Sequence, residues 1–195
     1  MRESPSRTTT DSRDRIRATA LRLFAAQGAA ATSLREVARE VGVAPGLVVH
    51  HFGGKDGLRA AVDECVVDLF REAVDSVPLE GPADEVIAAR DRAAAQMFED
   101  NPEAVDYLRR AVVTPDPGAE GLARMLMEET IRRTQTLRDH GIARSRIPLE
   151  EQAVAVLVRQ LGTLLLQPAL ERLWAMAQAP TPVPTVKVSL RRAED

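Results

Sequence analysis

The sequence predicts an all-α protein, with three helices at the N-terminus followed by a larger helical body. Apolar residues recur every three or four positions along most of the 195 residues, as they do on one face of a helix. No segment shows the alternation of apolar and polar residues that is typical of a strand. Glycine and proline residues divide the chain at intervals that suit helices of ordinary length.

The first predicted helix begins near Arg13 and ends before Gly28, because glycine commonly follows the last residue of a helix. Residues 1–10, ahead of this helix, are polar and are predicted to form a flexible arm. The apolar face of the helix, which we expect to be buried, comprises Ile16, Ala20, Leu23 and Phe24.

Two shorter helices follow, and together they predict a helix-turn-helix over about residues 33–52. Ser33 and Glu36 match a capping box, in which each side chain bonds a free backbone amide at the start of a helix. Gly42 allows the left-handed backbone of a tight turn, and Pro45 suits the first turn of the next helix. The apolar residues of the helix before the turn are Leu34, Val37, Ala38 and Val41.

Beyond residue 53, we expect a long helix from about Asp56 to Ser76 and five more helices. Those five are expected at about residues 83–99, 103–113, 118–140, 149–167 and 168–178. Pro168 is expected to separate the last two, because proline interrupts a helix. We expect one domain over residues 11–71 and a second domain over residues 72–178. Residues 179–195 are expected to form a tail that is ordered only if it docks on the rest of the chain.

The N-terminal part of the chain carries an excess of positive charge, which indicates that this part contacts a polyanion. Residues 1–55 hold nine Lys and Arg against five Asp and Glu, whereas the remainder holds 17 against 24, and the net charge is −3. Apolar runs such as residues 164–166 are far shorter than a membrane span, and the polar N-terminus lacks a secretory segment. Cys65 is alone, which excludes an intramolecular disulfide. These features predict a cytoplasmic protein that does not bind membranes.

The segment from Arg13 to Val62 resembles the N-terminal DNA-binding domain of the TetR family of transcriptional regulators (TetR/AcrR-type). The shared features occur in the family's order and spacing. They are the Ile16-Ala20-Leu23-Phe24-Ala25 face, Gly28, Thr32-Ser33, Val37-Ala38, Gly42-Val43, Gly46, His51-Phe52, Lys55 and Leu58. The resemblance implies that the third helix enters the major groove of DNA while the first two helices support it.

Ten residues are expected to contact DNA. Thr32 and Ser33 can offer hydroxyls and helix N-terminal amides to a phosphate, and Lys55 is placed for another phosphate. Arg35 can reach a phosphate or the edge of a guanine. The candidates on the third helix are Pro45, Gly46, Leu47, Val49, His50 and His51.

The third helix departs from the family pattern. Val49 stands where family members commonly carry a tyrosine that touches a phosphate, and Leu47 stands where many carry threonine. This helix has no Arg, Lys, Asn or Gln, so base recognition must rest on Arg35, His50 and apolar contact with thymine methyl groups. We expect weaker, more salt-sensitive or more shape-dependent operator binding than is usual for the family. An alternative is that Val48 and Val49 both pack inside the fold.

The C-terminal body is expected to provide dimerisation and, as the resemblance implies, a pocket for a small-molecule effector. In the family the last two helices of each subunit form the dimer interface, which spaces two recognition helices for a palindromic operator. The interface candidates are Val154, Leu157, Val158, Leu161, Leu165, Leu170, Leu173 and Trp174. The pocket candidates are Met97, Phe98, Tyr107, Met125, Met127 and Trp174. The alternative for both sets is ordinary core packing.

Taken together, these features favour a ligand-responsive repressor that binds double-stranded operator DNA as a homodimer. The rival hypothesis is a helical small-molecule-binding or interaction protein that has lost sequence-specific DNA binding, because the third helix is so poor in polar side chains. An enzyme is disfavoured, since the chain has no glycine-rich phosphate loop, nucleophile elbow or zinc-protease motif. No catalytic residue, metal or cofactor is expected.

Overall fold

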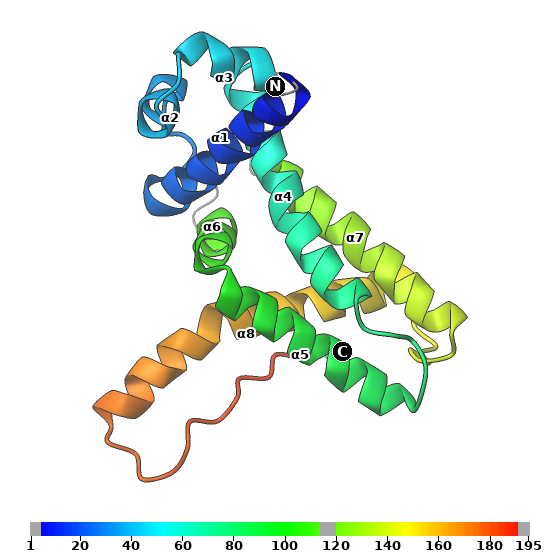
Figure 1. Ribbon diagram of the computed structural model, residues 1–195. Coiled ribbons are helices and arrows are strands. Elements are labelled where there is room, and N and C mark those ends of the chain that lie inside the picture. The colour runs from blue at the N-terminus through cyan, green and yellow to red at the C-terminus, as the bar shows by residue number, and fades with distance from the viewer. Residues whose placement is uncertain (1–4, 114–119, 191–195) are drawn as a thin grey trace. The chain divides into compact units, whose positions relative to one another are not determined.

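The computed structural model describes residues 5–113 and 120–190, and every regular element in those ranges is an α-helix (Figure 1). The helices are α1 (Pro5–Gln27), α2 (Leu34–Val41), α3 (Pro45–Phe52), α4 (Lys55–Asp75), α5 (Ala83–Asp100), α6 (Pro102–Val113), α7 (Glu120–Asp139) and α8 (Leu149–Met176). The predicted all-α fold is therefore confirmed. Helix α1 begins at Pro5, so residues 5–10 of the expected flexible arm are helical, and the first four residues of that arm lie outside the described ranges.

The helices form two compact units. The first contains the described residues up to Val77 together with residues 90–125, and the second contains residues 78–89 and the described residues from 126 onward. The boundary expected at residue 71 does not coincide with this division, because α6 and the second half of α5 pack with the N-terminal helices.

The first unit is built around the apolar face of α1. Ile16, Ala20 and Phe24 are buried as predicted, while Leu23 is half-buried. A fully buried side chain of the size of Ile16 or Phe24 contributes about 1.5–3 kcal/mol to folding. The buried residues that α2, α3 and the start of α4 bring to this core are Val37, Ala38, Val41, Val48, Phe52, Leu58, Ala61 and Val62.

Three arginines of α1 connect this helix to α2 and α3. The Arg15 guanidinium donates to the carbonyl of Val41 (3.0 Å), at the C-terminal end of α2. Arg22 forms an ion pair with Glu40 (2.8 Å), and the Arg13 guanidinium lies 5.4 Å from the centre of the Phe52 ring. Part of the positive charge of the N-terminal segment is therefore used to hold the three helices together.

The turn between α2 and α3 has the predicted chemistry. The Ser33 hydroxyl accepts a hydrogen bond from the Glu36 amide (3.1 Å), which is the first half of the capping box. The Glu36 carboxylate instead accepts from the Gln27 side chain (3.0 Å). Gly42 has a φ of 80°, a left-handed conformation that ends α2 and turns the chain toward α3. The predicted helix-turn-helix is thus present.

Helix α6 packs against α1 within the first unit. The Arg110 guanidinium donates to the carbonyls of Ala25 (3.2 Å) and Ala26 (2.9 Å), which are among the last carbonyls of α1. The ring centres of Phe24 and Tyr107 lie 6.3 Å apart. Since the final carbonyls of a helix have no partner within the helix, Arg110 acts as a C-cap supplied by another element.

Helix α8 differs from the prediction. Residues 149–176 form one helix that contains Pro168, rather than two helices separated there. Proline removes one backbone hydrogen bond, yet the chain stays helical on both sides of Pro168, from Leu149 to Met176.

After α8 the chain turns back and runs alongside the helix in an extended conformation (Figure 1). Gln178, with a φ of 50°, forms the reversal. We call residues 181–190 the strap. The predicted tail is therefore docked over these residues, whereas its last five residues lie outside the described ranges.

Three side chains of α8 bind the backbone of the strap. The Trp174 indole donates to the Thr181 carbonyl (2.8 Å) and the Thr163 hydroxyl to the Val186 carbonyl (3.1 Å). The side-chain oxygen of Gln167 accepts from the Val186 N–H (2.7 Å), and its side-chain nitrogen donates to the carbonyl of Pro184 (3.2 Å). Gly162 leaves room for the strap, since a Cβ atom at this position would lie 2.5 Å from the side chain of Val188.

Candidate nucleic-acid interface

One face of α3 is exposed to solvent. Pro45, Gly46, Val49 and His50 are exposed, and the side chain of Val49 is 47% exposed. These positions share a face because they are spaced one, four and five residues apart. The opposite side of α3 carries buried Val48 and Phe52, which belong to the core. The alternative that Val48 and Val49 both pack inside is therefore wrong for Val49. Leu47 and His51 are half-buried at the sides.

Two polar candidates beside α3 are exposed. Ser33 and Arg35 lie at the start of α2 and face solvent, so a phosphate could approach this helix N-terminus. Arg39, which the sequence reasoning missed, is also exposed and lies one turn beyond Arg35 on the same side of α2. Their spacing of four residues is the signal that could have identified Arg39.

Two other polar candidates have partners within the unit. Thr32 is buried, and its hydroxyl donates to the Gly28 carbonyl (2.9 Å) and accepts from the Gln27 side chain (3.1 Å). The expectation that this hydroxyl meets a phosphate is contradicted, because it closes the turn between α1 and α2. The Lys55 amine donates to the Ala30 carbonyl (2.8 Å) and is half-buried, so a phosphate would have to share or displace that bond.

Gly57 positions α3 and was missed by the sequence reasoning. A Cβ atom at this position would lie 1.8 Å from the carbonyl oxygen of Phe52, the last residue of α3. The first turn of α4 can approach the end of α3 this closely only because residue 57 has no side chain. Gly46 differs, since nothing lies within 4 Å of the position where its Cβ would be.

A buried polar pair in the first unit connects α4 and α6. The Tyr107 hydroxyl donates to the Asp63 carboxylate, and both residues are almost fully buried. Burial raises the pKa of Asp63, although the hydrogen bond from Tyr107 and the charge of Arg59 act in the opposite direction. Burial and the neighbouring carboxylate also raise the pKa of Tyr107, which therefore stays protonated and remains a donor.

The residues expected to line an effector pocket are distributed over different parts of the fold. Met97 is buried and half-buried Phe98 is nearby, in a cluster with Phe70, Val74 and Ala94 between α4 and α5. Tyr107 bonds Asp63, and the Trp174 indole bonds the strap. Met125 and Met127 are half-buried on α7. Of this set, Met97 and Phe98 share one hydrophobic cluster.

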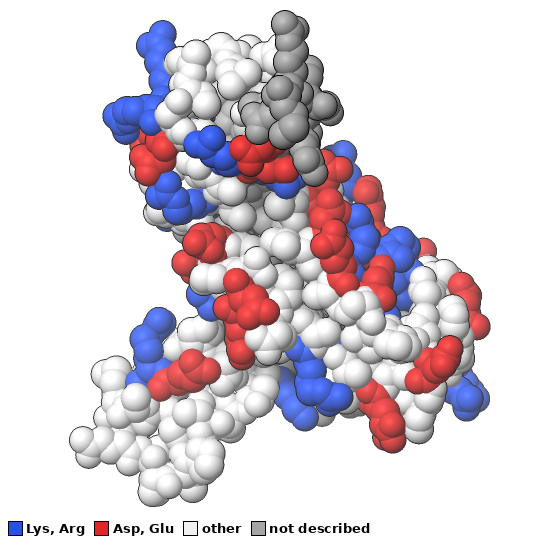
Figure 2. Space-filling model, viewed as in Figure 1, with Lys and Arg blue, Asp and Glu red and all other residues white. Residues whose placement is uncertain are grey.

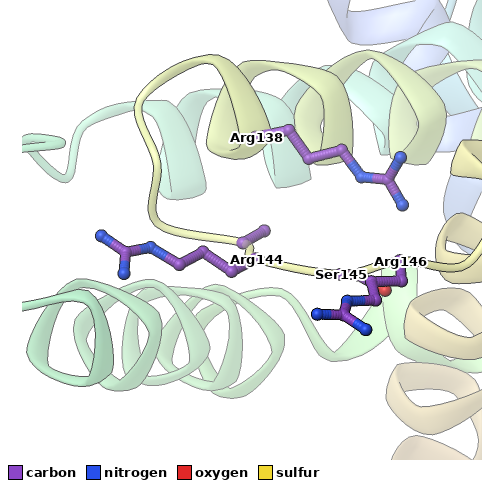
Figure 3. Close-up of a pocket in the computed structure, with 5 residues that line it drawn as sticks. Arg138, Arg144, Ser145 and Arg146 are labelled. Atoms are coloured by element: carbon purple, nitrogen blue, oxygen red, sulfur yellow. The ribbon is translucent and has the colours of Figure 1, made fainter.

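A basic hollow lies in the second unit, where the loop between α7 and α8 leaves a shallow open pocket lined by Arg138, Ala143, Arg144, Ser145 and Arg146 (Figure 3). The side chains of Arg138 and Arg144 point in opposite directions (Figure 3). Arg138 donates to the Gln152 side chain (2.7 Å) and to the Ile147 carbonyl (2.7 Å), so it holds the loop against the start of α8. These contacts give Arg138 a structural role.

The residues expected at a dimer interface are exposed or half-buried in the single chain. Val154 is 40% and Leu173 62% exposed, and Leu157, Val158, Leu161, Leu165, Leu170 and Trp174 are half-buried. An 18-residue window of α8 has a mean hydropathy of 1.5, yet only 6% of it is buried. By length and composition α8 could cross a membrane, contrary to what the short apolar runs suggested.

Residues 16–62 match the family described as bacterial regulatory proteins, tetR family. The transcriptional regulatory protein RaaS of Mycobacterium tuberculosis is 42% identical over 59 residues, which are 30% of this chain and 27% of RaaS. The chain thus spans about a quarter of the length of that relative.

The fold along most of the chain resembles solved proteins that are described as tetR-family regulators. One from a Shewanella species has a TM-score of 0.64 over 86% of this chain and 90% of its own, at 23% identity. Another from Syntrophomonas wolfei has a TM-score of 0.69 over 84% and 86%, at 18% identity. The N-terminal domain therefore belongs to the TetR family of bacterial transcriptional regulators, and the helices that follow have the fold of such proteins.

Proposed function

We propose that the protein is a cytoplasmic, ligand-responsive transcriptional repressor that binds a palindromic operator as a homodimer. The observation that carries the proposal is the exposed face of α3 in a helix-turn-helix of the TetR type. A helix that buries one side and leaves the other without contacts can enter the major groove, which is wide enough for an α-helix.

In this proposal α2 positions the protein on the phosphates and α3 meets the bases. Ser33 and Arg35 at the start of α2 bind one phosphate, with Arg39 available for the next. Pro45, Val49 and neighbouring residues of α3 face the groove. Gly57 and the arginine contacts of α1 keep α3 in place. The surface is therefore already ordered in the folded protein, and DNA binding does not have to supply the entropy of ordering it.

The homodimer is proposed on the surface of α8. An apolar helix that is so little buried in one chain requires a partner, and a second copy gives a symmetric one. The strap favours self-association over a membrane, because Thr163 and Gln167 bond a neighbouring segment of the same chain rather than facing lipid. Two copies would then present two α3 helices to the two halves of a palindrome.

Effector control is proposed as a shift between two conformations of the dimer. A ligand that binds better to the conformation whose recognition helices do not fit both half-sites would release the operator. The contacts of α6 with α1 and α4, through Arg110 and Tyr107, make α6 the natural element to carry such a change to the DNA-binding helices.

The test is selection from random duplex DNA with the purified full chain, followed by a gel-shift titration over a salt series. We expect an enriched palindrome, bound by two copies, with affinity that falls steeply as salt rises. The variant Arg35→Ala should weaken binding to all sequences alike and reduce the salt slope by about 1. Arg124→Ala, an exposed arginine on α7, is the matched control and should bind as the wild type does.

The rival is a helical binding protein that has lost sequence-specific DNA binding. The apolar face of α3 is the observation that favours this rival. Enrichment of no sequence above background, together with equal affinity of the wild type and Arg35→Ala for any duplex, would decide for the rival and against a repressor.

A further inference from the structure

We infer that α3 recognises thymine through its 5-methyl groups, with the side chain of Val49 as the main contact. The inference rests on the proposed function and specifies its ligand: an operator whose half-sites place thymine methyl groups in the major groove opposite α3. It depends on three features of α3: the exposure of Val49, the small number of hydrogen-bonding side chains around it, and the open space at Gly46.

Val49 is exposed and lies outside the core of the first unit. Among residues 11–77, Val49 is the one large apolar side chain that is exposed, whereas its neighbour Val48 is fully buried. On the exposed face of a helix that the proposed function places in the major groove, the side chain of Val49 is available to an apolar group of the DNA. In the major groove, that group is the methyl group of thymine.

The neighbours of Val49 on this face offer few hydrogen bonds to bases. Pro45 has no N–H and Gly46 has no side chain, so the imidazole of His50 is the one polar side chain on the exposed face of α3. The surface over α3 is largely white in Figure 2, whereas basic and acidic side chains lie over α2 beside it. Guanine and adenine are usually distinguished by bidentate Arg, Asn or Gln contacts, and none of these residues occurs on α3.

Gly46 allows the close approach that a methyl contact needs. Nothing lies within 4 Å of the position of a Cβ atom at residue 46, and the residue is helical, so packing within the chain does not require glycine there. A glycine in a helix has a conformational cost relative to alanine. That cost is accounted for if the DNA lies close against this turn of α3, one turn before Val49.

The experiment replaces thymine by deoxyuridine, which lacks only the 5-methyl group, one position at a time in the operator recovered by selection. For the wild type we expect at least one position per half-site at which affinity falls about fourfold, the factor for losing one buried methyl-sized group. In Val49→Ala the same replacement should change affinity much less, because the side chain that contacted the methyl group is gone. The matched control is Val112→Ala on α6, an exposed valine outside α3, which should retain the full fourfold difference.

Two results would overturn the inference. If deoxyuridine is tolerated at every position by the wild type, or if Val49→Ala retains the same preference for thymine, α3 does not recognise methyl groups, although the protein still binds its operator. If selection recovers no operator, the proposed function fails and the inference fails with it. Circular dichroism of both valine variants should match that of the wild type, because neither side chain is buried.

Discussion

Asp63 and Tyr107 place a titratable group inside the first unit, and this group makes stability depend on pH. Burial raises the pKa of Asp63 above its ordinary value of 3.8, so the folded state binds this proton more tightly than the unfolded chain does. The contribution of Asp63 to the free energy of unfolding is therefore greatest at low pH, and it falls as the pH rises from 3.8 through the pKa of Asp63 in the folded state.

We expect the variant Asp63→Asn to lose this dependence, because its amide oxygen still accepts from the Tyr107 hydroxyl but carries no charge. Denaturant unfolding between pH 4 and pH 8 should show a smaller decrease with rising pH for Asp63→Asn than for the wild type. Asp63→Ala is the control, since it leaves the Tyr107 hydroxyl buried without this acceptor and should be less stable than Asp63→Asn by about 1–3 kcal/mol at every pH. Parallel pH profiles for the wild type and Asp63→Asn would contradict this account.

Individual residues also mark where sequence reasoning was sufficient and where it was not. The glycine turn and the Ser33 cap follow from local rules, and both are present. Thr32 could not be separated from Ser33 in this way, because its burial depends on Gln27 and Gly28, which approach only when α1 packs on α2. The need for glycine at position 57 likewise arises from a contact between two helices, which periodicity does not reveal.

At the scale of elements, the contact between α6 and α1 gives a second prediction. Arg110 donates to two carbonyls at the C-terminal end of α1, while its neighbour Arg109 bonds Asp106 (3.1 Å) on the same helix. We expect Arg110→Ala to lower the free energy of unfolding by about 1–2 kcal/mol, because bonds from a charged donor to otherwise open carbonyls are lost.

Arg109→Ala is the matched control, since an exposed ion pair within one helix contributes about 0.3–0.5 kcal/mol. Denaturant titrations of both variants and the wild type measure the difference. Equal losses in the two variants would show that the contact of Arg110 with α1 is not a stabilising cap.

The elements themselves were predicted with uneven success, for physical reasons. The Ser33 cap of α2 and the glycine turn at Gly42 leave little freedom, and the helix-turn-helix predicted over about residues 33–52 agrees with the structure. Pro168 was expected to end a helix, but α8 continues through it, because a proline removes one hydrogen bond of the helix and the turns on either side keep theirs. The strap has no periodicity of its own, and its conformation depends on Gln167, Thr163 and Trp174 of another element.

At the scale of the whole molecule, α8 and the strap leave an apolar surface that one chain does not cover. The region around the end of α8 and the strap is largely white in Figure 2, with few charged side chains. Leu166 and Leu173 are exposed on α8, seven residues apart and therefore on one side of the helix, and Val183 and Leu190 of the strap are exposed as well. We expect a second copy to cover this surface.

The variant Leu173→Arg tests the proposed homodimer. Leu173 is 62% exposed in the single chain, so the substitution should leave the monomer folded, with an unchanged circular dichroism spectrum. Within an interface, an arginine without a partner is costly, by about 3–5 kcal/mol, which corresponds to a rise in the dimer dissociation constant of at least about 100-fold. Sedimentation velocity over a concentration series measures this change, and operator binding should weaken with it because one α3 helix then binds alone.

The matched control is Val113→Arg, at the end of α6, where the valine is 65% exposed and belongs to neither α8 nor the strap. This variant should dimerise and bind the operator as the wild type does, which separates burial at an interface from the general effect of adding a charge. A wild type that sediments as a monomer at every concentration would refute the homodimer itself. A Leu173→Arg variant that dimerises normally would instead place the interface away from the C-terminal half of α8.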